Sequence, residues 1–114
     1  MHDKRKVRRR HLLYFLRLSE ATTNNIVGDL QDLTPEGLMV VGTTLLEPGQ
    51  EYRLVMNLPP DVFRNPRLEF TARCIWSRPD PQSARFYTGF SLVDISTSEL
   101  ETIVSLITEY GAPE

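Results

Sequence analysis

The sequence predicts a mainly β protein: a small barrel of about six strands followed by one C-terminal α-helix. Its 114 residues suffice for one compact domain, and 40% hydrophobic with 25% charged residues is ordinary for a globular chain. Short apolar runs are separated by turn signals along most of the chain, which favours strands. The last apolar run changes to helical spacing, so a helix is expected to pack on the barrel.

The first half of the chain reads as three strands. Leu12, Tyr14, Leu16 and Leu18 alternate with their neighbours, which predicts a strand over His11–Leu18. The polar residues 19–25 predict a turn. Further apolar runs predict strands over Ile26–Leu33 and Leu38–Val41, with Glu47–Gln50 as another turn.

A tight turn is expected between the second and third strands, over Asp32–Gly37. Pro35 fixes its own φ, and Gly37 can adopt a positive φ. The residue types therefore predict a connection that reverses the chain within a few residues.

The second half predicts three more strands. Tyr52–Leu58 alternates cleanly and stops at two prolines, and Leu68–Trp76 has the best period-2 pattern in the chain. Cys74 and Trp76 share the phase of Phe70, which predicts that both lie in the core. Residues 78–85 form a polar hairpin loop before the last strand, Phe86–Val93.

A helix is predicted over about residues 97–110. Ser96 and Glu99 have the spacing of a capping box, in which each side chain accepts from the other residue's backbone amide. Leu100, Ile103, Val104 and Ile107 follow at helical spacing. Gly111 is the expected C-cap.

Charge is distributed unevenly along the chain, although the net charge is only -2. Residues 1–10 hold six basic side chains against Asp3 alone, a balance of +5, and the remainder is acidic. We expect residues 1–10 to be a flexible basic arm that contacts one local anion, and residues 11–114 to be a single domain. A merely solvated arm is the other interpretation.

Several function classes lack support in the sequence. No apolar run approaches the roughly 20 residues of a membrane span, and the N-terminus does not resemble a secretory signal. A single cysteine excludes an internal disulfide, and one Cys with two His argues against a zinc site. There is no nucleophile elbow, phosphate-binding loop or catalytic triad pattern. We expect a cytoplasmic protein that is not an enzyme and has no metal or cofactor.

Two motifs remain, and their order and spacing are informative. The first is Arg5-Lys-Val-Arg-Arg9, of the form Arg-x-x-x-Arg, and a shifted version runs from Lys6 to Arg10. The second is Asp32-Leu-Thr-Pro-Glu-Gly37, of the form Asp-x-Thr-x-x-Gly. Together they resemble the PilZ domain family of bacterial cyclic di-GMP receptors, and the resemblance covers nearly the whole chain. It implies a six-stranded antiparallel β-barrel of the split-barrel type with a C-terminal α-helix.

The resemblance also implies a ligand site. Arg5 and Arg9 correspond to the arginine clamp, and Arg10 serves in the shifted register; Asp32, Thr34 and Gly37 form the second wall. Arginine matches phosphate oxygens and the guanine O6/N7 edge, whereas an Asp can accept from the guanine N1 and N2 hydrogens. Thr34 stands where the family usually has Ser, which keeps the hydroxyl and adds a methyl group.

The function implied is a cyclic di-GMP receptor that changes conformation on binding and signals to a protein partner in motility, adhesion or biofilm control. The alternative is a PilZ-type interaction adaptor that binds no nucleotide. Nucleic-acid binding by the basic arm is a third hypothesis, and the acidic remainder of the chain argues against it.

Overall fold

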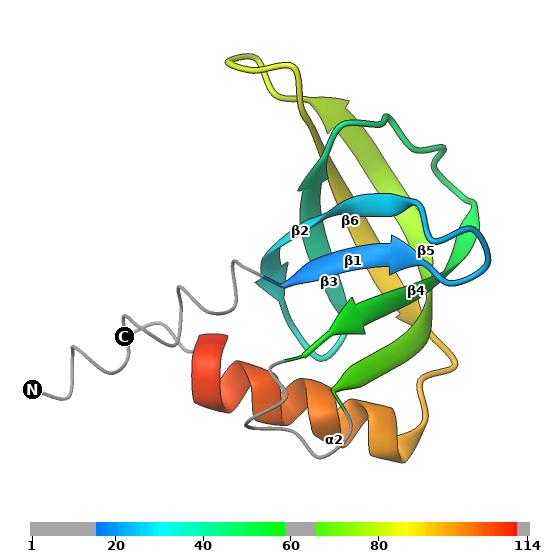
Figure 1. The fold of residues 1–114 in the computed structure, drawn as a ribbon, viewed down its shortest axis with the longest axis vertical. Helices are drawn as coiled ribbons and strands as arrows, with labels where there is room; N and C mark the ends of the chain where they lie inside the picture. Colours follow the sequence, from blue (N-terminus) through cyan, green and yellow to red (C-terminus); the bar gives the residue numbers. More distant parts are fainter. Residues whose placement is uncertain (1–15, 59–65, 112–114) are drawn as a thin grey trace, which may run out of the picture.

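The chain folds as a closed barrel of six antiparallel strands with one helix at its end (Figure 1). The computed structural model describes residues 16–58 and 66–111. Neighbouring strands follow the order β1-β2-β3-β6-β5-β4, and β1 closes the barrel by pairing with β4. The fold class predicted from the sequence is confirmed. The strands are β1 (Arg17–Glu20), β2 (Ile26–Leu33), β3 (Gly37–Gly42), β4 (Glu51–Asn57), β5 (Arg67–Pro79) and β6 (Phe86–Val93).

Most strand predictions are correct to within a few residues. β2 and β6 have the predicted bounds, whereas β5 is longer and takes in Arg78 and Pro79, which were assigned to the hairpin loop. These two residues remain in the strand because they pair with Tyr87 and Phe86 of β6.

The predicted bounds of the first strand are wrong at its C-terminal end. Ser19 and Glu20 were assigned to a turn, but they continue β1 because they pair with Val55 and Leu54 of β4. Residues 11–15 of the predicted strand lie outside the described residues. The closing β1–β4 pairing thus includes residues that look polar and turn-like in the sequence.

The helix α2 (Thr97–Leu106) begins at the predicted capping box, which is confirmed. Ser96 Oγ accepts from the Glu99 amide at 3.1 Å, and Glu99 Oε1 accepts from the Ser96 amide at 3.1 Å. The α-helix ends at Ile107, where φ is -62° and the backbone stays right-handed. The chain then widens into the π-helical turn η1 (Ile107–Gly111), so the prediction that Gly111 caps the helix is wrong.

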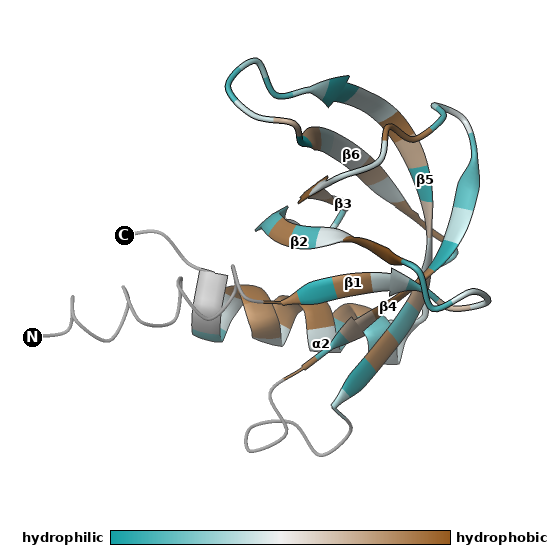
Figure 2. Cartoon of the chain, turned by 45° about the horizontal axis from the view of Figure 1, so that its top comes forward, coloured by the Kyte–Doolittle hydropathy of each residue, from teal (hydrophilic) through white to brown (hydrophobic). Residues whose placement is uncertain are grey.

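One hydrophobic core fills the barrel and continues onto α2. Phe70 of β5 is fully buried in it, and α2 adds Ile103 and Leu106. Figure 2 shows hydrophobic residues along the strands and on α2, while the loop between β5 and β6 is hydrophilic. Cys74 is also buried, as predicted, and this burial raises the pKa of its thiol, so the thiol is protonated at neutral pH.

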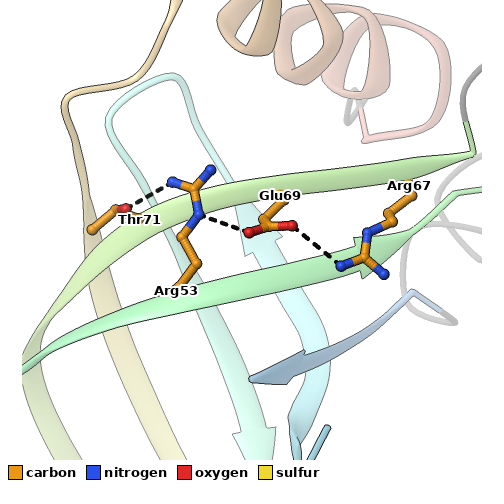
Figure 3. Close-up of polar contacts among 4 residues, drawn as sticks. All are labelled: Arg53, Arg67, Glu69 and Thr71. Atoms are coloured by element: carbon orange, nitrogen blue, oxygen red, sulfur yellow. Dashed lines mark hydrogen bonds and ion pairs between the residues drawn. The ribbon is translucent and has the colours of Figure 1, made fainter. Parts of the chain in front are cut away.

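Charged side chains pair across β4 and β5 on the outer surface of the barrel (Figure 3). Glu69 accepts from Arg53 Nε at 2.9 Å and from Arg67 Nη2 at 3.2 Å. Arg53 Nη1 also donates to Thr71 Oγ1 at 2.9 Å, and Arg73 pairs with Glu51 farther along the strands. The three charged residues of Figure 3 and the Arg73–Glu51 pair lie at the surface, so each ion pair contributes little to stability.

Arg53 and Arg67 lower the pKa of the Glu69 carboxyl group. The pKa of Glu69 lies below its ordinary value, first because of the hydrogen bond from Arg53 and then because of that from Arg67. A pKa that is lower in the folded state adds stability above the unfolded pKa, and this gain disappears as the pH falls through the folded pKa.

We expect Arg67→Ala to raise the pKa of Glu69, because the substitution removes one of the two hydrogen bonds that favour the carboxylate. An NMR titration of the Glu69 side-chain carboxyl carbon measures this directly, with Arg73→Ala as the control variant on the same strand. An unchanged Glu69 titration in Arg67→Ala would show that the second hydrogen bond does not form in solution.

Candidate functional site

A groove of about 370 Å³ lies on the surface of the barrel, beside the turn that joins β2 to β3. It contains all three residues that the sequence predicts for the second motif, Asp32, Thr34 and Gly37. The opposite wall comes from β5 and β6, which are distant in sequence. The lining residues are Asp32, Thr34, Glu36, Gly37, Leu38, Met39, Ile75, Trp76, Gly89 and Phe90.

A β-bulge at Gln31 brings Asp32 to the outside. Leu30 pairs with Val40 and Asp32 with Met39, so Gln31 is the extra residue on β2. In an uninterrupted strand, Leu30 and Asp32 would share a face, because side chains two apart point the same way. The bulge shifts this phase, so that Leu30 and Leu33 are buried and Asp32 is exposed.

A second bulge, at Ile75, does the same for Trp76. Cys74 pairs with Phe90 and Trp76 pairs with Gly89, so Ile75 is the extra residue on β5. Ile75 is 53% exposed at the groove. The prediction that Trp76 lies in the core is wrong, because the bulge moves its ring to the outer surface.

Gly89 and Arg78 both lie adjacent to the Trp76 indole ring. A Cβ atom at position 89 would lie 2.5 Å from the Trp76 ring, so glycine is needed for the indole to approach β6 this closely. Ser77 continues the inner face in place of Trp76, and its Oγ lies 2.8 Å from Oγ1 of buried Thr88. The Arg78 guanidinium stacks on the indole at 4.4 Å from the ring centroid.

The Thr34 hydroxyl holds the motif turn together. Its Oγ1 accepts from the amides of Glu36 and Gly37 at 3.2 and 3.1 Å, and it donates to the Gly37 carbonyl at 3.3 Å. The Thr34 amide also donates to the Gly37 carbonyl at 2.8 Å. The hydroxyl that Thr34 shares with the usual Ser of the motif is therefore engaged within the turn in this structure.

Gly37 is required for a different reason from the one predicted. A positive φ was expected, but among the described glycines only Gly49 has one. A Cβ atom at Gly37 would lie 2.2 Å from the Phe90 carbonyl oxygen, so glycine is needed for the close approach of β3 to β6. The turn is thereby held against the strand that carries Gly89.

The described lining of the groove is acidic. Asp32 Oδ1 accepts from the Leu33 amide at 3.0 Å, and Glu36 supplies a second carboxylate. No Lys or Arg is among the described lining residues, although Arg78 lies next to Trp76. An anionic ligand would therefore need positive charge from another part of the chain.

The first motif lies outside the described residues, as do Arg5, Arg9 and Arg10. Sequence reasoning also missed Ile75 and assigned Trp76 to the core. The pairing of Trp76 with Gly89 is the feature that could have placed Trp76 on the outer surface. A glycine opposite a tryptophan on the neighbouring strand leaves room for the ring to cover the glycine backbone.

Within residues 16–58 and 66–111, no cluster of three or more His, Cys, Asp or Glu side chains could hold a metal ion. None of the described helices has both the length and the apolar character needed to cross a bilayer.

Comparisons with known proteins agree with the barrel fold. Residues 3–109 match the PilZ domain family. The structure is similar to the Bacillus subtilis inhibitor of motility (MotI/DgrA), with a TM-score of 0.66, 16% identity, and coverage of 79% of this chain and 43% of that one. It is also similar to the PilZ domain of Escherichia coli YcgR, solved with cyclic di-GMP, with a TM-score of 0.61, 15% identity, and coverage of 84% and 80%.

The two structural similarities and the family match support different conclusions. At 15–16% identity the structural likeness shows the fold alone, and the chain spans less than half of MotI/DgrA. Comparison with curated proteins gives no significant match. The family match, in contrast, extends over nearly the whole sequence and includes both motifs. The chain belongs to the PilZ domain family.

Proposed function

We propose that the chain is a cyclic di-GMP receptor that binds its ligand in the groove between the β2–β3 turn and Trp76. The observation that carries this proposal is the pair of β-bulges, which turn Asp32 and Trp76 out of the barrel and into one groove. Membership of the PilZ domain family supports it, and the similar domain of YcgR was solved with cyclic di-GMP.

The groove offers two kinds of contact that suit a guanine base. The Asp32 carboxylate is exposed and can accept from the guanine N1 and N2 hydrogens, which no basic side chain can do. Met39, Ile75 and Trp76 supply apolar and aromatic surface for the face of a purine. A base held in this way is recognised by both its edge and its face.

The phosphates need positive charge, which the described lining of the groove lacks. The six basic side chains of residues 1–10 are the richest source of such charge in the sequence. In this proposal Arg5 and Arg9 clamp the ligand with their planar guanidinium groups, and Arg10 assists. Residues 1–10 act as a basic arm that orders on the ligand, and residues 11–114 form the single domain that holds the groove.

Binding that orders an arm changes the shape and charge of the receptor surface, which a protein partner can detect. We propose a non-catalytic role of this kind in the cytoplasm, without a metal or cofactor, in the control of motility, adhesion or biofilm formation. No binding of nucleic-acid polymers is part of this function.

Isothermal titration of the purified chain with cyclic di-GMP tests the proposal, with cyclic di-AMP and GTP as controls for base and charge. We expect saturable heat with cyclic di-GMP alone, and its loss in Arg5→Ala and Arg9→Ala variants that retain the parent's circular dichroism spectrum. A folded chain that gives no heat at high ligand concentration would contradict the receptor function and leave the interaction adaptor.

A further inference from the structure

Glu36 places a second carboxylate in the groove, and the ligand roles assigned above do not use it. Its backbone is fixed on both sides: the amide donates to Thr34 Oγ1 at 3.2 Å, and the carbonyl accepts from the Leu92 amide at 2.9 Å. Its side chain is exposed and has no hydrogen bond or ion pair among the described residues. The main chain therefore holds residue 36 at the groove, and no cation among the described residues pairs with its carboxylate.

The charge of Glu36 bears directly on an anionic ligand. Cyclic di-GMP carries two phosphodiester groups, and the only other charged side chain lining the described groove is Asp32. The repulsion by Asp32 is opposed by the guanine hydrogens that its carboxylate accepts in the proposed function, whereas Glu36 has no such assignment. Like charges within about 8 Å repel measurably at a protein surface, and salt weakens that repulsion.

We propose that Glu36 is an affinity-setting residue that weakens the binding of the anionic ligand by electrostatic repulsion. This inference rests on the proposed function. The Glu36 carboxylate raises the concentration of cyclic di-GMP at which the receptor is half-saturated. The expected size is about two- to fivefold in Kd at low ionic strength, as for one partly screened charge at this range.

Glu36→Gln tests this inference, because it removes the charge and keeps the size of the side chain and the backbone bonds of the turn. Glu101→Gln is the matched control: it makes the same change in net charge at an exposed position of α2, away from the groove. Kd for cyclic di-GMP is measured by titration at about 50 mM and about 300 mM salt, with circular dichroism to show that each variant is folded.

We expect Glu36→Gln to bind about two- to fivefold more tightly than the parent at low salt, with a smaller difference at high salt, and Glu101→Gln to match the parent. Unchanged binding in Glu36→Gln would overturn the inference while leaving the receptor function intact. Weaker binding would also overturn it, because the carboxylate would then accept a hydrogen bond from the ligand. A parent chain that does not bind would overturn both proposals together.

Discussion

Replacing Asp32 by Ala is expected to reduce cyclic di-GMP binding by at least about 100-fold, while the barrel stays folded. The carboxylate is the proposed acceptor for two guanine hydrogens, and a site that loses its partner for a substrate N–H group leaves that group unpaired. Asp32 is exposed, and its one hydrogen bond within the described chain is to the adjacent Leu33 amide. Its loss therefore costs the fold little. Titration calorimetry of the variant gives the change in Kd.

Asp29→Asn is the control for this experiment, because Asp29 lies on the same strand outside the groove and pairs with Arg17. It is expected to bind like the parent. Parent-like affinity in Asp32→Ala would show that the ligand does not use this carboxylate, and the assignment of the groove would then be wrong.

Replacing Phe70 by Ala is expected to lower the free energy of unfolding by about 3–5 kcal/mol, the usual cost of deleting a buried phenyl ring. Phe70 is a fully buried residue of β5, within the core that joins the barrel to α2. Urea denaturation measured by circular dichroism gives the change. Val104→Ala, at a position 44% exposed on α2, is expected to differ from the parent by less than about 0.5 kcal/mol.

Because Phe70→Ala could remove much of the stability of a small domain, Phe70→Leu serves as a milder variant. It keeps most of the volume and is expected to cost less than Phe70→Ala. A loss below about 1 kcal/mol in Phe70→Ala would contradict a barrel packed around this ring.

The fold was largely predictable because its signals are local. The alternation from Leu68 to Cys74 in β5 reflects one buried face, and the capping box at Ser96 and Glu99 reflects backbone amides that need acceptors. The end of α2 was less predictable. Gly111 looks like a C-cap in the sequence, but the right-handed backbone at Ile107 leads into a π-helical turn.

The site was only half predictable, because two bulges decide which side chains reach it. The motif turn with Asp32 and Thr34 is contiguous in sequence, so its members were expected together. Ile75 and Trp76 were missed because strict alternation keeps Trp76 in the phase of Phe70, and a bulge has no reliable local signal. The bulge in β5 explains the error for Trp76, because one extra residue moves every later side chain of the strand to the opposite face.

The central claim is that cyclic di-GMP binds in the groove between the β2–β3 turn and Trp76. The most direct measurement is an NMR titration of the ¹⁵N-labelled chain with cyclic di-GMP. We expect the largest shifts at the amides of Thr34, Gly37 and Gly89 and at the single tryptophan Nε1–H. Saturable shifts that leave these signals unchanged would place the ligand elsewhere and contradict the claim.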